Sequence, residues 1–213
     1  ISFLVALSLV APCAFAQAGL EVLPFGPTER LRPSGGLSVL PPPAFRAARN
    51  ETESLQFAIR AVGGNLNKVD LSLSPFALAD GTQLPASATV LYREVCVNVR
   101  RSSPRATEAP GLIPDALVPL LHPQTGDKIK PHYWNGEKLE GAAYGGTPFD
   151  IWQEHNEGIW LDVHVPADAV PGDYTATLRV TAENAQAVEE ALRINDQLGM
   201  IEQQINETLG RMN

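Results

Sequence analysis

The sequence predicts an all-β protein: an antiparallel β-sandwich, Ig-like or jelly-roll-like, with a long loop insertion and a C-terminal α-helix. Two observations support this prediction. Short segments alternate apolar with polar residues, which is the pattern of a sheet with one face buried and the other in water. The chain also contains 18 prolines and 17 glycines, which separate these segments as turns do.

The first element is the uncharged apolar run ISFLVALSLVAPCAFA, residues 1–16, which ends in Ala14-Phe15-Ala16. This pattern is typical of a secretory signal peptide cleaved after Ala16. A buried strand or a membrane anchor is the alternative, but the run is shorter than the roughly 20 residues of a membrane span. A lipoprotein signal fits less well, because Pro12 precedes Cys13 where a small residue is needed. We therefore expect a secreted or periplasmic protein with no stable membrane span after cleavage.

Six strands are expected between the turns. Their ranges are 20–23, 53–62, 68–74, 88–99, 158–165 and 173–181. In the second of them, Phe57 and Ile59 lie on the face expected to be buried, and Gln56 and Ala58 lie on the opposite face, expected to be wet. Such alternation places one side of each strand in the core of a sandwich.

The clearest turn lies in VPADAVPGDYTATLRV, residues 165–180. Pro166 ends a strand because it cannot donate to a ladder hydrogen bond. Pro171 and Gly172 suit the two central positions of a type II turn. Tyr174 then begins the next alternating strand on its core side. Each of these residues has a structural role, so we expect this turn to be architectural.

Two segments break the rhythm. Residues 101–157 are rich in proline and glycine and are expected to form a long loop, which in compact domains is usually functional or mobile. Residues 183–194 suit either a helix or a strand, whereas apolar residues at helical spacing predict a helix over about 196–212. That helix needs a partner surface, either the sandwich or a second chain. The chain then divides into a signal peptide (1–16), a sandwich domain (17–194) and a C-terminal helix or linker (195–213).

Three segments carry a resemblance to a known family. They are NETESLQFAIRA (50–61), GLIPDALVPL (111–120) and GIWLDVHVPADAVPGDYTATLRVTA (158–182), in that order. Together they resemble the N-terminal β-sandwich domain that precedes the catalytic barrel of glycoside hydrolase family 123-like proteins and the related DUF4091 proteins. The resemblance covers roughly residues 44 to 182. It implies a bacterial, exported, carbohydrate-active context, with catalysis by a C-terminal (β/α) barrel that uses an acidic residue and the N-acetyl group of the substrate. No such barrel lies in this sequence, which departs from the family after about residue 194, so no catalytic residue is carried over.

Composition excludes several classes of function. Lysine and arginine number 16 against 24 aspartates and glutamates, a net charge of −8, and nucleic-acid binding needs a basic face. No phosphate-binding or nucleophile motif occurs, so no cofactor is expected. Cys13 leaves with the signal peptide. Cys96 therefore has no partner, and we expect a small buried hydrophobe in preference to a catalytic thiol.

Three carboxylates form the weak catalytic candidates. Asp150, Glu154 and Glu157 cluster in FDIWQEHNEG. A glycosidase needs two carboxyl groups across the scissile bond, one of them with a raised pKa. A polar loop of an acidic protein also contains such residues, and this is the interpretation that we favour.

Metal binding is not expected. His122, His132, His155 and His164 lack the spacing of zinc ligands. Asp80 and Asp127 lie in acidic loops without a calcium-loop pattern.

Aromatic residues gather in the long connection: Tyr133, Trp134, Tyr144, Phe149 and Trp152. Exposed rings beside amides or carboxylates can stack on the apolar face of a sugar. Alternatively the rings cover the sandwich and are buried themselves, which is the interpretation that we favour. Tyr133, Trp134, Tyr144 and Trp152 remain the candidate ligand-binding residues.

The sequence thus predicts a non-catalytic accessory or structural module of a secreted carbohydrate-active protein, with carbohydrate and a C-terminal catalytic barrel as the partners to expect. A carbohydrate-binding or adhesion module that uses the loop aromatics is the alternative. A glycosidase acting through the loop carboxylates is the less favoured third.

Overall fold

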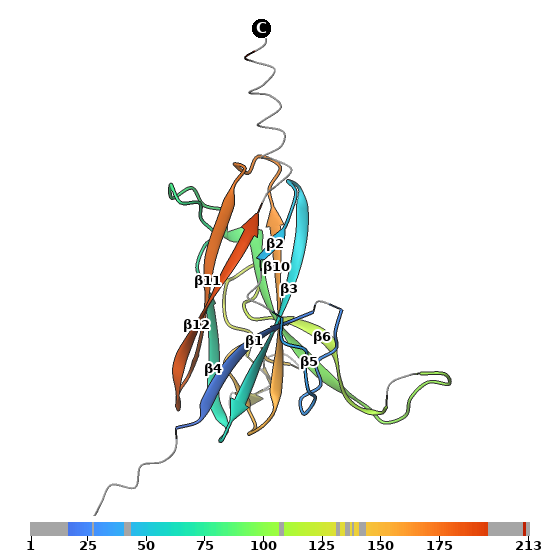
Figure 1. Ribbon diagram of the computed structural model, residues 1–213. Coiled ribbons are helices and arrows are strands. Elements are labelled where there is room, and N and C mark those ends of the chain that lie inside the picture. The colour runs from blue at the N-terminus through green and yellow to red at the C-terminus, as the bar shows by residue number, and fades with distance from the viewer. Residues whose placement is uncertain are drawn as a thin grey trace, which may run out of the picture.

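The computed structural model describes residues 17–26, 28–40, 44–106, 109–130, 133–134, 137, 139–140, 144–195 and 211. In this part of the chain the strands form two five-stranded sheets, which lie face to face, and a short two-stranded sheet (Figure 1). The predicted all-β sandwich is confirmed.

Each large sheet combines one pair of consecutive strands, β5–β6 or β11–β12, with strands distant in the sequence. Sheet A has the order β1 (Gly19–Phe25), β3 (Glu51–Val62), β10 (Asn156–Val165), β5 (Thr89–Val99) and β6 (Gly111–Pro119). Sheet B has the order β2 (Ala44–Arg46), β12 (Ala185–Asn195), β11 (Asp173–Ala182), β4 (Leu66–Leu73) and β9 (Phe149–Ile151). The remaining elements are η1 (Ala86–Ala88), β7 (Tyr133–Trp134) and β8 (Leu139–Glu140). Neighbouring strands are antiparallel except β2 and β12. The six predicted strands correspond to β1, β3, β4, β5, β10 and β11.

The core lies between the two sheets and follows the alternation of the sequence. Ile159 and Leu161 of β10 point toward sheet B and are fully buried, as are Leu178 and Val180 of β11, which point back. The polar residues between them in β11 are exposed. Burial of each such apolar side chain stabilises the fold by roughly 1.5–3 kcal/mol.

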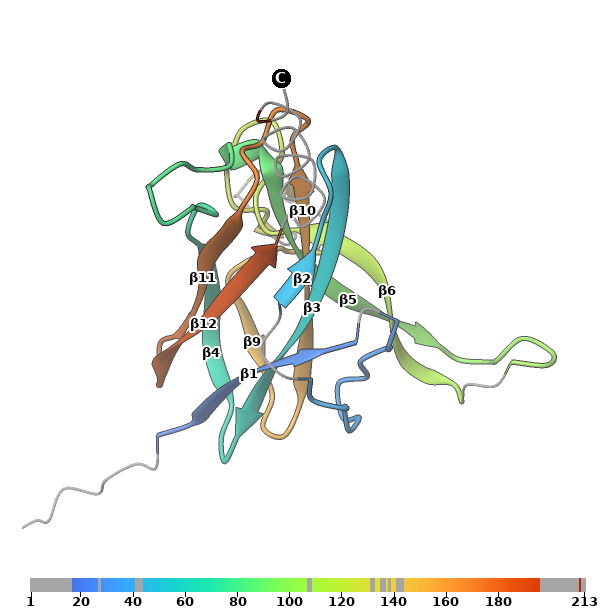
Figure 2. The same ribbon diagram turned by 45° about the horizontal axis from the view of Figure 1, so that its top comes forward.

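Strand β3 is buried on both faces, so the prediction of a wet face is wrong for its middle. On the side away from the core, Ala58 is fully buried and Gln56 is 6% exposed. Phe25 and Leu31 cover Ala58 and form a second, small hydrophobic cluster with it. The reason is that residues 28–40 return along the outside of sheet A beside the β5–β6 hairpin, which extends beyond the body of the sandwich (Figure 1, Figure 2).

The turn between β10 and β11 is architectural in its contacts, as predicted. The hydroxyl of buried Tyr174 donates to the carbonyl oxygen of Val170 at 2.6 Å and closes the turn. Gly172 has a φ of +154°, more extended than the roughly +80° of a type II turn. A Cβ at Gly172 would lie 2.8 Å from Cδ2 of Leu78, so this position suits glycine.

The segment 101–157 is not one continuous loop. Residues 111–119 form β6, which pairs with β5, and residues 149–151 form β9, which pairs with β4. Pro114 and Pro119 are tolerated in β6 because this strand lies at the edge of sheet A and its register shifts beside Pro114.

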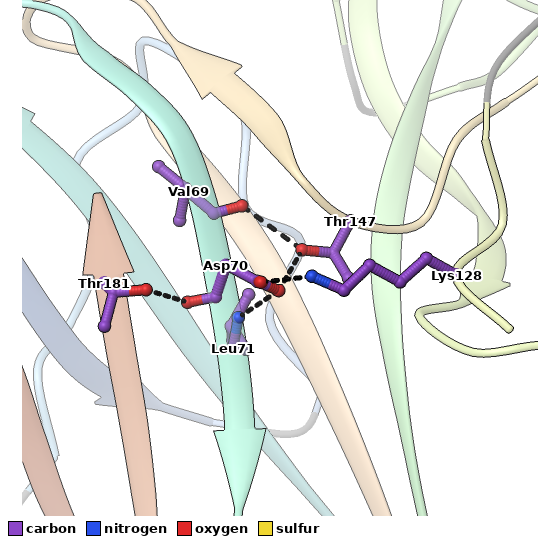
Figure 3. Close-up of polar contacts among 6 residues, drawn as sticks. All are labelled: Val69, Asp70, Leu71, Lys128, Thr147 and Thr181. Carbon is purple, nitrogen blue, oxygen red and sulfur yellow. Dashed lines mark hydrogen bonds and ion pairs between the residues drawn. The ribbon is translucent and has the colours of Figure 1, made fainter. Parts of the chain in front are cut away.

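A polar cluster fixes the connection between β6 and β9 to strand β4 (Figure 3). Lys128 donates to the carboxylate of Asp70, and the hydroxyl of Thr147 donates to the same side chain at 2.8 Å. The backbone nitrogen of Leu71 donates to it as well, at 3.0 Å. Burial alone would raise the pKa of Asp70, but the hydrogen bonds from Lys128 and Thr147 lower it below its usual range.

The structure describes the C-terminal part of the chain without a break up to residue 195. Residues 185–195 form strand β12, which resolves the open choice between helix and strand over 183–194. The helix predicted over 196–212 and the signal peptide predicted over 1–16 lie outside the described residues, apart from Arg211. None of the residues that the structure describes forms a helix with the length and hydropathy of a membrane span.

Candidate functional site

The three candidate catalytic carboxylates each have a separate structural partner. Asp150 accepts a hydrogen bond from the backbone nitrogen of Lys68 at 2.8 Å, where the strand adopts a positive φ. Glu154 accepts from the backbone nitrogen of Gly63 at 3.0 Å and lies 3.7 Å from the guanidinium of Arg60. These two residues stabilise irregular backbone at the ends of β4 and β3.

Glu157 lies on the core side of β10, opposite Ile59 of β3. Its carboxylate accepts a hydrogen bond from Nε of Arg93 at 2.5 Å, and the Arg93 guanidinium lies 4.4 Å from the centre of the Phe149 ring. Burial raises the pKa of Glu157, and the charge of Arg93 opposes that rise. The pair therefore lies on the core side of sheet A, with both side chains only about one-fifth exposed.

The candidate aromatic residues separate into two groups. Phe149 is buried in the main core, as expected for a ring that covers the sandwich. Trp152 is 68% exposed and Tyr144 is 44% exposed, so the favoured expectation of buried rings is wrong for these two. Tyr133 and Trp134 form β7, but their side chains lie outside the described part of the structure.

Cys96 and the three histidines that the structure describes belong to no metal-binding cluster of described residues. No group of three or more His, Cys, Asp or Glu side chains that could hold a metal ion occurs among the described residues. His164 forms a hydrogen bond with Thr52 across two strands at 3.1 Å, and Asp80 closes a turn by accepting from the backbone nitrogen of Thr82. Cys96 is a free thiol. Burial raises the pKa of this thiol to about 11, and the negative charges of Glu157 and Glu94 contribute to the rise to a lesser degree. It therefore stays protonated at neutral pH and is a poor nucleophile.

Sequence reasoning missed a cavity of about 180 Å³ on the outer face of sheet A. Its walls come from the three strands β3, β10 and β5, from the edge strand β6 and from the segment that follows β1. The residues that line it are Glu29, Arg30, Gln56, Glu94, Pro114, Asp115, Ala116, Leu117 and Trp160.

Glu94 is the most unusual group of this cavity. It pairs with Gly158 of β10, and a Cβ at Gly158 would lie 2.7 Å from Oε2 of Glu94, so the glycine leaves the space that the carboxylate occupies. Glu94 is only 6% exposed, and its Oε1 atom has no hydrogen-bond partner in the described structure. Burial, and to a lesser degree the charge of Glu157, raises the pKa of Glu94 to about 7.

The neighbouring side chains are held in place by hydrogen bonds. Nε1 of Trp160 donates to Asp162 at 2.5 Å, and the hydroxyl of Ser54 donates to the same oxygen at 2.6 Å. Gln56 pairs with Trp160, and its amide nitrogen donates to the carbonyl oxygens of Gly26 and Glu29 at 2.9 and 3.2 Å in the orientation that satisfies both ends of the amide. The cavity therefore has preformed walls.

One signal for this cavity was present in the sequence. The three segments that carry the family resemblance meet here: Gln56 comes from the first, Pro114 to Leu117 from the second and Trp160 from the third. The register of the strands brings them together, with Trp160 between Gln56 and Tyr92 and with Gly158 between Ala58 and Glu94. Alternation alone places these side chains on one face but does not give that register.

Comparison with solved structures relates this fold to a glycoside hydrolase. The chain is similar to a family 123 glycoside hydrolase from Clostridium perfringens, studied for its hydrolysis of glycolipid glycans, with a TM-score of 0.54 and 16% sequence identity. The match covers 84% of this chain but only 27% of the hydrolase, so the chain spans about a quarter of that protein. At this identity the likeness establishes a shared fold and nothing more.

A second solved structure is AvmM, which catalyses macrocyclization in alchivemycin A biosynthesis. The match covers 84% of this chain and 89% of the AvmM chain at 7% sequence identity, and its TM-score of 0.41 is too low to support an argument. The chain matches no protein-family model, and no curated protein resembles it closely enough in sequence to be matched.

Proposed function

We propose that this chain is a non-catalytic accessory β-sandwich module of an exported, carbohydrate-active protein of the glycoside hydrolase family 123-like and DUF4091 group. Its role is to position a catalytic domain or the substrate of that domain. The observation that supports this most is that 84% of the chain resembles a part, about a quarter, of a family 123 glycoside hydrolase.

The contacts of the candidate carboxylates also support a non-catalytic role. Asp150 and Glu154 hold backbone nitrogens, and Glu157 is paired with Arg93 on the core side of β10. A glycosidase needs two carboxyl groups that face one another across a substrate. Residues committed to separate structural contacts are poorly placed for that chemistry.

Hydrolysis of aryl N-acetylhexosaminides tests the proposal directly. We expect the purified chain to release no more phenol than buffer does, and Glu154→Gln to behave as the unaltered chain does. Turnover by the chain that disappears in Glu154→Gln would overturn the non-catalytic role. A longer product of the same gene is the complementary test, since we expect any hydrolytic activity to belong to residues outside this chain.

Exposure of Trp152 and Tyr144 favours the second candidate function, a carbohydrate-binding or adhesion module. Affinity electrophoresis through gels that contain polysaccharides separates the two, with Trp134→Ala and Trp152→Ala as the variants. Equal migration of the three proteins in every gel excludes sugar binding by these rings. Retardation of the unaltered chain that either variant relieves identifies the binding module instead.

A further inference from the structure

The cavity on the outer face of sheet A carries an excess of negative charge. Three carboxylates, Glu29, Glu94 and Asp115, line it together with one guanidinium, that of Arg30. When all four groups are ionised, the lining has a net charge of 1 − 3 = −2. Focused negative potential of this kind attracts cations.

Glu94 gives the cavity a specific anchor point. The side chain is more than nine-tenths buried and lines the cavity, and Oε1 lacks a hydrogen-bond partner in the described structure. An unpaired buried carboxylate is unfavourable, and the usual compensation is a proton or a cationic partner that donates hydrogen bonds. Among the residues that the structure describes, no cationic side chain is recorded as a hydrogen-bond donor to Oε1 of Glu94, which leaves a proton or a further cationic group as the compensation.

Trp160 provides the matching aromatic wall. Its indole nitrogen is tied to Asp162 at 2.5 Å, which fixes the orientation of the ring beside Glu94. A fixed aromatic ring next to a carboxylate suits a guanidinium or an ammonium group, which can form an ion pair and a cation–π contact at once.

The size of the cavity limits what can enter. At about 180 Å³ it is smaller than the roughly 300–1,000 Å³ of pockets that hold drug-sized ligands. It admits the end of one side chain or a single sugar unit. The ligand therefore enters by its charged end and leaves the rest of its structure in solvent.

We infer that this cavity binds an organic cation, a guanidinium or primary ammonium group, with Glu94 as its counter-ion and Trp160 as its aromatic wall. The group can belong to an arginine or lysine side chain of a partner protein or to an amino sugar. The inference stands on the geometry of the cavity alone and is independent of the accessory role proposed above.

The test is a titration of the ¹⁵N-labelled chain, observed at the Trp160 indole resonance, which Trp160→Phe assigns among the three tryptophans. The probes are N-acetyl-arginine amide and glucosamine, each with a neutral analogue, N-acetyl-citrulline amide and N-acetylglucosamine. Phosphate buffer at pH 7 is used, because Tris is itself a primary ammonium and the amine of glucosamine is largely neutral at pH 8. We expect both cations to shift the Trp160 resonance with saturation, and the neutral analogues to leave it unchanged. The tighter of the two cations identifies the source of the natural ligand.

Two arms tie the binding to Glu94. Glu94→Gln should weaken the affinity for the better cation about tenfold or more, as expected for loss of a buried charge partner worth at least about 1.4 kcal/mol. Glu21→Gln, which removes an exposed charge on β1 outside the cavity, should not change it.

The affinity for N-acetyl-arginine amide, whose guanidinium stays protonated throughout, should also fall about tenfold from pH 8 to pH 6, because a carboxyl with a pKa of about 7 is mostly ionised at the first pH and mostly protonated at the second. The other charged groups near Glu94 are Glu29, Arg30 and Asp115 in the lining and Glu157 of β10. Equal shifts by the neutral analogues, or unchanged affinity in Glu94→Gln, would overturn the inference. Absence of any shift up to about 0.1 M cation would overturn it as well.

Discussion

At the scale of single residues, buried Glu94 and partly buried Glu157 lie on opposite faces of the same sheet and have different environments. Glu157 points into the sandwich and forms an ion pair with Arg93. Glu94 points outward into the cavity, with no hydrogen-bond partner for Oε1 in the described structure. Burial raises the pKa of both carboxyls, but only Glu157 has a cation to oppose that rise. The protein therefore tolerates a charge at Glu94 at a cost to its own stability.

This cost predicts the effect of Glu94→Gln on unfolding. The pKa of Glu94 is raised from 4.5 to about 7, so between these two values the native state holds a proton that the unfolded state has lost. Stability then falls as the pH rises through this window, by roughly 3 kcal/mol in total, and the loss remains above pH 7. Glutamine has no such proton to lose. We expect Glu94→Gln to unfold at higher urea concentration than the unaltered chain at pH 8, with a gain of up to about 3 kcal/mol, and to be nearly equal at pH 4.

Glu21→Gln is the control, since it removes one charge of the same sign from an exposed position. It should change the free energy of unfolding by less than about 0.5 kcal/mol at either pH. The free energies of unfolding of Glu94→Gln and the unaltered chain should differ at pH 8 but hardly at pH 4. An equal difference at both pH values would show that Glu94 is not the titrating group.

At the scale of elements, strands with a clean alternation could be predicted, and strands specified by their neighbours could not. Tyr174, Leu178 and Val180 identify β11 from the sequence alone, and they are buried as expected. The prolines of β6 argue against a strand until its edge position is known. Residues 183–194 read equally well as a helix, and the pairing of β12 with β11 and β2 decides for a strand.

The cluster around Asp70 belongs to this scale, because it ties a long connection to β4. Lys128 comes from the connection and Thr147 from the residues before β9, and both donate to the Asp70 carboxylate (Figure 3). We expect Lys128→Met to increase amide hydrogen exchange over residues 121–130, since the tether is lost. The free energy of global unfolding should change by less than about 1 kcal/mol, because the ion pair is partly exposed.

Lys130→Met is the matched control, since Lys130 lies on the same segment and is exposed. Exchange over residues 121–130 that rises equally in both variants would contradict the tether. The pKa of Asp70 is lowered, so its contribution to stability is present above its unfolded pKa of about 3.8 and is lost as the pH falls through the lower, folded value. The tether should therefore persist at pH 5.

At the scale of the whole molecule, the candidate site was less predictable than the fold. The carboxylates and aromatics that attract attention in residues 133–157 are close in sequence, but the structure gives Asp150, Glu154 and Glu157 separate roles. The cavity instead gathers residues from 29 to 160, and only the strand register and the return of residues 28–40 over sheet A assemble it. Neither can be read from a local pattern.

The same long-range assembly predicts that the two sheets unfold together. The main hydrophobic cluster contains Phe57 and Ile159 from sheet A and Leu178 and Ile194 from sheet B, so neither sheet has a separate core of comparable size in the described structure. Ile159→Ala and Leu178→Ala should each lower the free energy of unfolding by about 2–5 kcal/mol, because each leaves a cavity at a fully buried position.

In each variant, urea unfolding should be a single transition at which far-UV circular dichroism and tryptophan fluorescence change together. Native-state hydrogen exchange should give β3 and β11 the same reduced stability in both variants. If Leu178→Ala lowered the protection of β11 and left that of β3 unchanged, the sheets would be separate cooperative units, and the sandwich would not be the single rigid platform that an accessory module requires.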